Sequence, residues 1–426
     1  LRITVSTHNS LQEISYLGKL IGKHYDKVLA ATGNSYEKVG RVFKRNFAVN
    51  KKVSVKKVEL FSASIFSSIS EIEETLWNSL LGDHAFDYSG IKFLEDYFSN
   101  LNPDDPNHME LRYHIVKDKE GIVQAMTYTS VSLWKEDMLS HEVVSKKIEK
   151  VRETDPTFLT EKVMSTGSTF TEGTHVYVNS DAKDLRLLQR TFFDSVEHEF
   201  EKGNYGKLVF RDFRKNYFLY HTAHDRGYLI VNMPDAAVFS DFDWEGFDEF
   251  EQILSKRSRR HFRQDVSPFV DAYDVVSANE LSESDLSTAY KLYCEVKANN
   301  FSINNFEYGF DLFAAMNKSS LWQFLILRNK GEEEIQGIVF CYLNKSNNSF
   351  NPILIGMREG NPERLTVYRQ LLFQTILYAK ENSYSKIYMG VSAVFEKRKL
   401  GAKIAYRQAY VRAMDNYSID LLQTYE

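Results

Sequence analysis

Hydrophobic and polar positions along this chain fall into two long stretches that predict a similar succession of elements. In the first stretch, residues at helical spacing come first, and alternating strand-like segments follow around a turn at Asp118 to Gly121. Ser70 and Glu73 have the spacing of a capping box at the first helix. The predicted helices span 70–81, 91–98 and 184–201, and the predicted strands span 110–117, 122–133, 163–168, 175–178 and 206–211.

The second stretch repeats this order from about residue 282. Ser282 or Ser284 is suited to cap its first helix, and Asn361 with Pro362 to begin its third. The predicted helices span 282–297, 305–316, 364–381 and 393–415, and the predicted strands span 322–328, 335–343, 349–357 and 385–389. This repetition predicts an α/β protein with two tandem halves, residues 58–255 and 256–426, each a mixed, mostly antiparallel sheet flanked by helices.

Composition adds a few limits to this picture. A chain of 426 residues is too long for one compact core, so two or three domains are expected. Aromatic residues make up 14% of the chain, which supplies apolar area for cores and also for grooves that hold chain-like ligands. The net charge of −5 gives no electrostatic reason to expect nucleic-acid binding.

The cysteine content and the lengths of the apolar runs bear on location and on metals. Cys294 and Cys341 are too few for a disulfide framework or a cysteine-rich zinc site, so no bound metal is expected. No apolar run approaches the ~18 residues that span a bilayer, and the sequence does not open with a secretory signal. A cytoplasmic protein with at most peripheral membrane contact is therefore expected.

The opening segment, LRITVSTHNSLQEISYLGKLI, predicts a strand and a capped amphipathic helix that cannot bury a core by themselves. It resembles the last strand and helix of the pyridoxal-phosphate α-oxoamine synthases, the family of 8-amino-7-oxononanoate synthase and serine palmitoyltransferase. The resemblance covers residues 1–30 and implies a fused or docked synthase domain, with no pyridoxal phosphate held by this chain. Residues 31–57 form a basic linker, which is either solvated or attracts coenzyme A phosphates or an anionic membrane.

Two motifs, together with Trp77 in the first predicted helix, carry a second resemblance to a known family. GVSAVFEKRKLGAKIAYRQAYVRA follows a predicted strand, and LSKRSRRHFRQDVSPF lies between the two halves. Over residues 60–415 the order of elements and these motifs resemble the FemAB-like branch of the acetyltransferase (GNAT) superfamily. The resemblance implies splayed central strands that hold an acyl thioester, and a following helix whose N-terminus faces the pyrophosphate of coenzyme A.

That resemblance also implies a set of binding residues. The loop of Arg358, Gly360 and Asn361 lies where the pyrophosphate loop is expected, although it departs from the usual Arg/Gln-x-x-Gly-x-Gly/Ala pattern. Arg364 and Arg369 on the following helix are candidates to assist with phosphate charge, or else face solvent.

Two further candidates come from the quoted motifs and are assigned to substrate. Lys397 belongs to the closing segment, and Arg260 belongs to a basic stripe at helical spacing that also contains Lys256, Arg259 and Arg263. The stripe is either a solvated face or a site for the phosphates of a coenzyme, a carrier protein or an acidic lipid.

Amide formation needs one proton removed, so a general base was sought among polar residues near strand ends. His175 begins a predicted strand after the GSTFTEG turn, and Asp212 lies just past a buried strand, where it is either a base or a partner of a neighbouring arginine. His221 and Asp225 match a His-x-x-x-Asp spacing that recurs by chance.

The sequence therefore predicts an N-acyltransferase that uses acyl-coenzyme A or an acyl carrier protein. Its acceptor would be an amine, such as a long-chain amino ketone or lipid amine made by a fused synthase. The alternatives are a FemAB-like aminoacyltransferase and a non-catalytic docking module.

Overall fold

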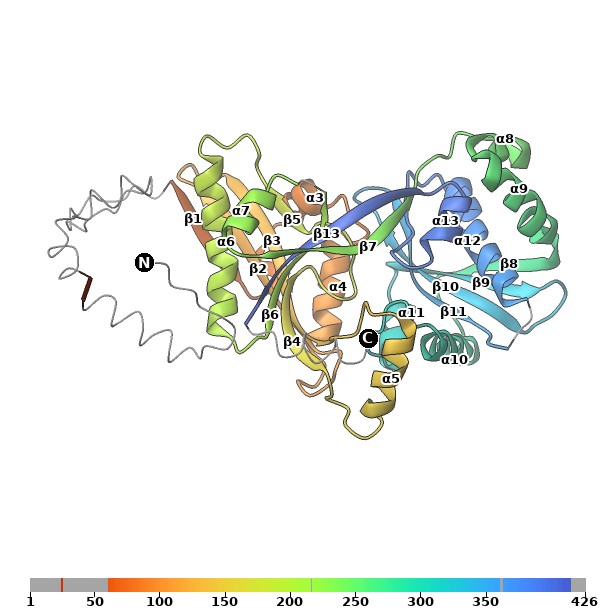
Figure 1. Cartoon of the computed structure of the whole chain (residues 1–426). Helices are drawn as coiled ribbons and strands as arrows, with labels where there is room; N and C mark the ends of the chain where they lie inside the picture. Colours follow the sequence, from red (N-terminus) through yellow and green to blue (C-terminus); the bar gives the residue numbers. More distant parts are fainter. Residues whose placement is uncertain (1–23, 26–59, 216, 361–362, 415–426) are drawn as a thin grey trace. The chain divides into compact units, whose positions relative to one another are not determined.

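Two β-sheets flanked by helices organise the chain (Figure 1). The computed structural model describes residues 24–25, 60–215, 217–360 and 363–414, and those from residue 60 onward pack as one unit. The predicted opening strand, helix and basic linker lie outside the described residues, apart from His24 and Tyr25. No helix in the described ranges is long and apolar enough to cross a membrane.

The larger sheet, here called sheet A, has the strand order β1-β2-β3-β4-β6-β13-β7-β12, with β5 paired to β3. All its ladders are antiparallel except β4 with β6. Its strands are β1 (Phe61–Phe66), β2 (Met109–Asp118), β3 (Val123–Lys135), β4 (Thr160–Thr166), β5 (Val176–Val178), β6 (Lys207–Arg214), β7 (Leu229–Phe239), β12 (Ile387–Tyr388) and β13 (Lys403–Ala413).

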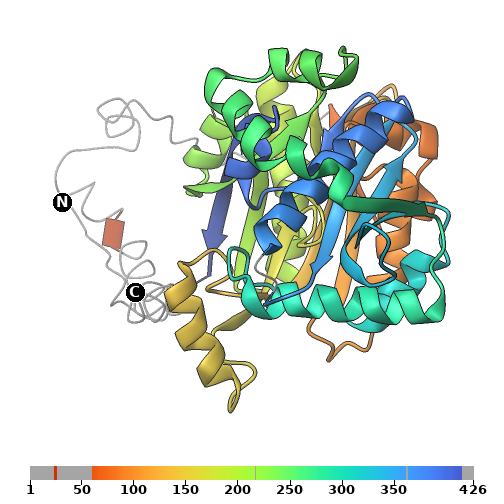
Figure 2. The ribbon, with the colours of Figure 1, turned by 90° about the vertical axis from the view of Figure 1, so that its right-hand side faces the viewer.

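The smaller sheet, sheet B, is fully antiparallel with the order β11-β10-β9-β8, and the side of the molecule that carries it faces the viewer in Figure 2. Its strands are β8 (Tyr273–Ala278), β9 (Trp322–Asn329), β10 (Ile335–Asn344) and β11 (Ser349–Met357). The helices are η1 (Ile69–Glu71), α3 (Glu74–Leu81), α4 (Tyr88–Phe98), α5 (Glu142–Arg152), α6 (Leu185–Lys202), α7 (Tyr220–Asp225), α8 (Gly246–Ile253), α9 (Lys256–Asp265), η2 (Ser267–Ala272), α10 (Glu283–Asn299), α11 (Phe310–Asn317), α12 (Arg364–Glu381) and α13 (Val394–Lys399).

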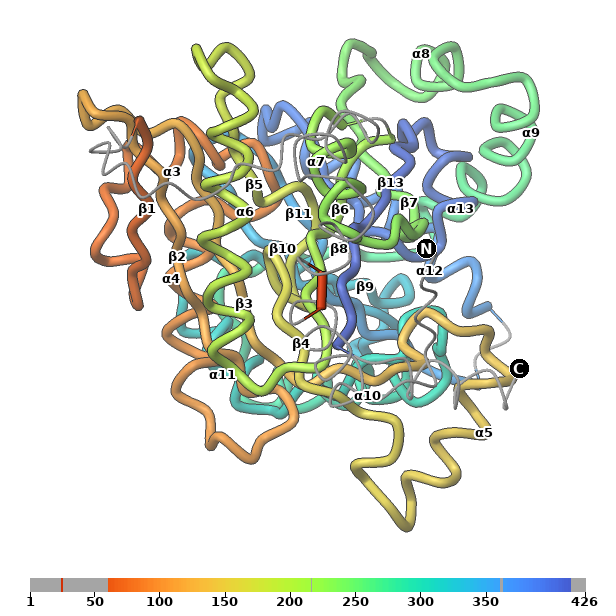
Figure 3. The backbone as a smooth tube through the Cα atoms, turned by 60° about the vertical axis from the view of Figure 1, so that its left-hand side comes forward, coloured from red at the N-terminus to blue at the C-terminus, as the bar shows by residue number. Residues whose placement is uncertain are grey.

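The predicted final helix over 393–415 is wrong. Helix α13 ends after Lys399 because Gly401 adopts φ +94°, a conformation that stops a helix at little cost for glycine. The following residues form β13, which inserts between β6 and β7 and pairs with both (Figure 3). Its backbone donors and acceptors are therefore satisfied by strands of the first half of the chain.

Other predicted boundaries shift by a few residues. The first helix is divided into η1 and α3, and the capping box is formed by Ser68 and Glu71 in place of Ser70 and Glu73. The helix predicted from residue 305 begins at Phe310. The Ser282 cap and the Asp118 to Gly121 turn are confirmed, because the Ser282 side chain accepts the Asp285 N–H and the Gly121 N–H bonds to the Asp118 carbonyl.

The two predicted halves interlock instead of forming separate bodies. Strands β12 and β13 follow residue 256 in the chain but belong to sheet A. One hydrophobic core joins α3, α4 and β2 to α10, α11 and sheet B. At its centre Phe86 contacts Tyr342, with 4.6 Å between ring centroids, and also faces Trp322. Burial of such large side chains dominates core energetics, so each half depends on the other for stability.

Candidate active site

Strands β11 and β12 meet at one end and then separate. A single parallel bridge joins Ser349 to Lys386, with the Phe350 N–H bonded to the Lys386 carbonyl at 3.1 Å. Beyond it β12 pairs with β7 in sheet A, whereas β11 remains the edge strand of sheet B. Among the described residues no strand pairs with the edge of β11 that faces this gap, so backbone groups there are free to contact a ligand.

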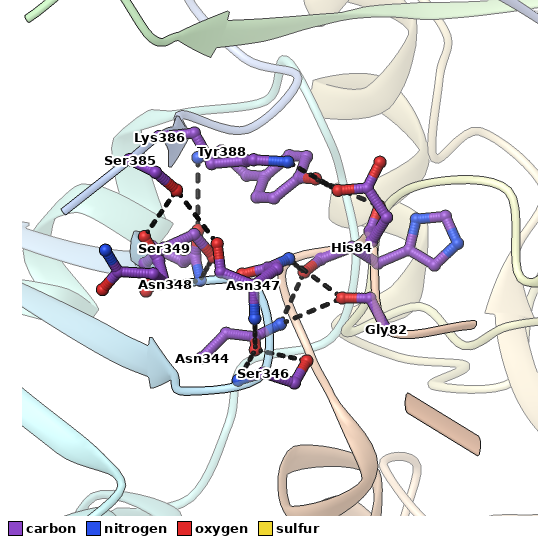
Figure 4. Close-up of polar contacts among 12 residues, drawn as sticks. Gly82, His84, Asn344, Ser346, Asn347, Asn348, Ser349, Ser385, Lys386 and Tyr388 are labelled. Carbon is purple, nitrogen blue, oxygen red and sulfur yellow. Dashed lines mark hydrogen bonds and ion pairs between the residues drawn. The ribbon is translucent and has the colours of Figure 1, made fainter. Parts of the chain in front are cut away.

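Polar contacts fix this junction between the sheets (Figure 4). The side-chain amide of Asn347, in the turn before β11, donates to the carbonyls of Gly82 and His84, both at 2.9 Å. Lys386 forms an ion pair with Asp83 at 2.6 Å, and the Tyr388 hydroxyl donates to the Asp83 carbonyl at 3.0 Å. The 82–84 loop of the first half therefore holds β11 and β12 at the point where they separate.

A cavity of about 710 Å³ begins at this separation and is lined by both halves of the chain. Most of its wall is apolar, including side chains from β3, β11 and α12. Its polar residues gather where the loop between β4 and β5 approaches α13. The lining includes Trp134, Met233, Ile355, Tyr368, Leu371, Met389 and the polar residues Glu172, Arg211, Asp212, Arg364 and Lys397. This size and composition are typical of a small-molecule site.

The equivalent gap in the first half is closed. Strands β4 and β6 pair in parallel over three rungs, and the loop that follows β4 turns back to β3. Arg211 bonds this loop to β6, donating from Nη1 to the Ser168 carbonyl at 2.6 Å and from Nη2 to the Thr171 carbonyl at 3.1 Å. Only the gap beside β11 therefore opens into the cavity just described.

Glu172 lies in that β4–β5 loop and lines the cavity. Gly173 beside it has φ +102°, and a Cβ there would lie 2.8 Å from the His84 Nδ1, so glycine is required for the loop to pack. The carboxylate accepts the Gly390 N–H, while its Oε2 is enclosed and has no hydrogen-bond partner in the described part of the chain. Burial raises the pKa of Glu172 above its usual range, although Lys397 opposes the shift.

Lys397 reaches the same end of the cavity from the last turn of α13. It is only 4% exposed, and among the described residues no hydrogen-bond or ion-pair partner lies within 4 Å of its ammonium. Burial lowers the pKa of Lys397, and the nearby Glu172 raises it in part. Two ionisable groups with pKa values displaced toward each other are thus brought together at the polar end of an otherwise apolar cavity, which is characteristic of functional sites.

The predicted base candidates have different positions. Asp212 lines the cavity, but it lies within β6 and not after it, at φ +67°, and its Oδ2 is 2.8 Å from the Arg211 Nε. His175 precedes β5 and packs against Gly167 and the rings of His84 and Tyr128, outside the lining of the cavity. Burial holds the pKa of His175 well below its usual value. The His221 side chain on α7 also lies outside this lining.

The predicted coenzyme loop does lie between a strand and a helix, connecting β11 to α12. Its arginines, however, are paired with carboxylates. Arg358 lies 3.0 Å from Glu334, and Arg364 lies 2.7 Å from Glu359. Gly360 adopts φ +71°, and Asn361 lies outside the described residues. This loop therefore presents less free positive charge to a pyrophosphate than its sequence indicates.

Arg369 and Arg260 are both outside the cavity lining. Arg369 forms an ion pair with Glu396 at 3.0 Å, which fastens α12 to α13. Arg260 is exposed on α9 and donates to Gln264 at 3.1 Å. In the same stripe Arg263 is paired with Glu251 at 2.6 Å. Among the described residues, no cluster of three His, Cys, Asp or Glu is arranged to hold a metal ion.

Of the residues that form the polar end of the cavity, the sequence indicated Lys397 and Asp212 but not Glu172. The GSTFTEG segment predicts only a tight connection between strands, and the structure confirms that it connects β4 to β5. The available signal was an acidic residue between two glycines of a short loop, Gly167 and Gly173, both with positive φ. Such backbone geometry allows a side chain to be presented inward.

Comparisons with known proteins place this geometry among known folds. No family model and no curated protein matches the sequence. Among solved structures, FemX superposes with a TM-score of 0.51 and 8% identity, over 84% of this chain and 99% of that chain. A tandem GNAT protein from the clavulanic acid biosynthesis pathway superposes with a TM-score of 0.48 and 9% identity, over 83% of this chain and 98% of that chain. L-PGS from Bacillus licheniformis superposes with a TM-score of 0.41 and 14% identity, over 62% of this chain and 85% of that chain.

The similarity to FemX extends over most of the chain and shows the fold. The described part of the chain is a mixed α/β structure with two sheets flanked by helices. The predicted fold class is confirmed.

Proposed function

We propose that the protein is an N-acyltransferase that moves an acyl group from a thioester to an amine. The observation that carries this proposal is the meeting of Glu172 and Lys397 at the polar end of a cavity that opens between β11 and β12. Acyl transfer to an amine needs a base, a group that stabilises the developing oxyanion, and a place for the acyl chain. The cavity offers all three.

In the proposed reaction the amine nitrogen attacks the thioester carbonyl carbon. Glu172 takes the proton that the amine loses, and the Lys397 ammonium donates to the carbonyl oxygen as it becomes negative. The C–S bond then breaks, the proton passes to the departing thiolate, and amide and thiol are released. A carboxylate with a raised pKa is a stronger base near neutral pH than an exposed one, and an ammonium without a competing partner is free to serve the oxyanion.

The size of the apolar part favours a long acyl chain over acetyl. An acetyl group has three heavy atoms, which at about 30 Å³ each occupy about 90 Å³, against a cavity of about 710 Å³. Ile355, Leu371 and Met389 line the remainder. We include in the proposal a thioester of coenzyme A or of a carrier protein, and an acceptor such as the amino ketone or lipid amine that an α-oxoamine synthase would supply. An open cavity of this kind argues against a docking module without catalysis.

The test measures thiol release and amide formation with acetyl, octanoyl and palmitoyl thioesters, each on coenzyme A and on a carrier protein, with a long-chain amine. We expect turnover with the longer chains.

Glu172→Gln should lower kcat by about 10²- to 10⁴-fold while leaving the protein folded. The wild-type rate should follow a bell-shaped pH profile with its acid limb above the usual carboxyl range and its alkaline limb below the usual lysine range, because burial displaces both pKa values. Thiol release no faster than in a protein-free control with every donor would overturn the proposal.

A further inference from the structure

Arg407 on β13 is a cation that forms no ion pair with any described residue. It is half-buried, and its Nε is enclosed without a hydrogen bond. Among the described residues no carboxylate oxygen lies within 4 Å of its guanidinium. Leaving a guanidinium partly desolvated and unpaired is unfavourable, so a purely structural role does not explain this arginine.

The strand register places this cation beside the cavity. Arg407 is opposite Met233 of β7, and directly opposite residues in a ladder project to the same face of the sheet. Met233 lines the cavity, so Arg407 lies beside it, although Arg407 is not itself part of the lining. On its other side Arg407 is opposite Arg214 of β6, a like-charge pair that destabilises a sheet. A local rule broken without visible compensation is expected at functional positions.

The charges at the polar end of the cavity do not balance. Arg211 is matched by Asp212 at 2.8 Å. Of the remaining cations, Lys397 interacts with Glu172, and Arg407, beside the lining, interacts with both Asp212 and Glu172 without forming an ion pair. Two carboxylates therefore face three cations. One positive charge is therefore left over when Glu172 is ionised, and two are left over when it is protonated. This end of the cavity attracts an anion.

We propose that Arg407 binds an acid group on the acceptor, so that the substrate is an amine that also carries a carboxylate, sulfonate or phosphate. This inference rests on the proposed acyl transfer. A guanidinium presents paired N–H donors that match the oxygens of all three acid groups, which a lysine ammonium does not. Because Arg407 interacts with Glu172, an acid group held there leaves the neighbouring amine close to the base.

The same strand offers a matched control. Arg412 also lies on β13 and is half-buried, but it is paired with Glu197 at 3.5 Å and with Glu201 at 3.3 Å. Arg412 is therefore an arginine of the same strand whose charge is balanced by carboxylates of the fold. Arg407→Gln and Arg412→Gln therefore remove the same charge from one strand, at an unpaired and a paired position.

The experiment compares acceptors of one chain length: an alkylamine, the 2-amino acid, the 2-aminoalkanesulfonate and the 2-aminoalkyl phosphate. In the wild type we expect at least one acidic amine to have a KM at least tenfold below that of the plain alkylamine, and the lowest KM identifies the acid group. Arg407→Gln should raise that KM at least tenfold and leave the KM of the alkylamine unchanged. Arg407→Lys should restore part of the loss, and Arg412→Gln should change neither KM.

A calorimetric titration without any donor separates the two proposals. Acetate, methanesulfonate and methyl phosphate are titrated into the wild type and into Arg407→Gln. Binding that the substitution weakens at least tenfold supports the anion subsite even if no amine is acylated, in which case the proposed function alone has failed. Equal use of plain and acidic amines by the wild type, or an Arg407→Gln variant with unchanged KM and unchanged anion binding, would overturn the inference.

Discussion

Arg211 and Asp212 are neighbours in β6, yet their side chains form an ion pair with 2.8 Å between Nε and Oδ2. Adjacent residues of a regular strand point to opposite faces of the sheet. Here Asp212 adopts φ +67°, and the β6–β13 ladder loses its register beside it, between Gln408 and Tyr410. This irregularity turns both side chains toward the cavity. Backbone strain of this kind is kept where the surrounding structure uses it.

The strain at Asp212 predicts an unusual order of stabilities. A left-handed backbone costs about 1–2 kcal/mol for most residues, less for Asp or Asn, and nothing for Gly. Asp212→Gly should therefore be more stable than Asp212→Ala by about 1 kcal/mol, and Asp212→Asn should be tolerated best. Urea denaturation measures the three free energies of unfolding.

A control for this comparison is Ala409→Gly, at a buried position of the neighbouring β13. It should lose about 0.5–1 kcal/mol, because glycine is unfavourable at ordinary strand angles. The explanation from φ fails if Asp212→Ala is as stable as Asp212→Gly while the control behaves as expected.

Replacing Lys397 should raise the stability of the protein and abolish its activity. Lys397→Met keeps the apolar stem and removes a buried ammonium that forms no ion pair or hydrogen bond with a described residue, so the free energy of unfolding should rise by about 1–2 kcal/mol while acyl transfer is lost. Chemical denaturation and a turnover assay measure the two effects. Lys399 is the matched control, because its ammonium is 2.9 Å from Glu396 and 4.2 Å from the centre of the Phe395 ring. Lys399→Met should lower stability slightly; a comparable loss in Lys397→Met would mean that its ammonium stabilises the fold.

Two buried histidines, His114 and His175, and the half-buried His84 predict sensitivity to acid. Burial lowers the pKa of His84 and of His114 to about 4, and it lowers the pKa of His175 as well. The unfolded chain takes up a proton at each near pH 6.5, whereas the folded protein does not, so stability falls as the pH drops from about 6.5 toward 4. Across that pH range His84 and His114 each lower the free energy of unfolding by about 3 kcal/mol.

His114→Gln isolates one of these protons. Glutamine can still bond to Ser195 and Thr129, which His114 contacts at 3.1 and 3.2 Å, but it does not titrate. The difference in unfolding free energy between wild type and variant should change by about 1.4 kcal/mol per pH unit between pH 6 and 4.5. Parallel stability profiles for the two proteins would show that His114 does not resist protonation.

Arg369 should prove structural, and Arg364 should affect the donor. The Arg369 side chain is 14% exposed and pairs with Glu396, so Arg369→Gln should cost about 3 kcal/mol and leave the KM of the thioester unchanged. Arg364 lines the cavity at the start of α12 and is more exposed. Arg364→Gln should change stability by less than about 1 kcal/mol and raise the KM of the thioester. A raised KM for the thioester in an Arg369→Gln protein that remains stable would show that Arg369 belongs to the donor site.

Local sequence was sufficient for elements whose signals lie within a few residues. The Ser282 cap and the turn at Gly121 both form as their patterns indicate, because each bond joins groups at most four residues apart. The position of the loop between β11 and α12 also followed from the order of elements. The tandem arrangement could be predicted for the same reason, since repeated succession constrains topology.

The site and the final strand depended on contacts that the local pattern does not contain. Residues 403–413 suit either a helix or a strand, and they form β13 because β6 and β7, far earlier in the chain, leave room for a strand between them. The sequence does not indicate that the pKa of Glu172 is raised, because that shift comes from the burial of its carboxylate near Lys397 in the folded protein. The sequence by itself determined which segments are helices and strands in most of the chain, because backbone preference and hydrophobic periodicity are local. Tertiary structure alone decided which strands meet and which charges are left without a partner, because both depend on burial created by distant segments.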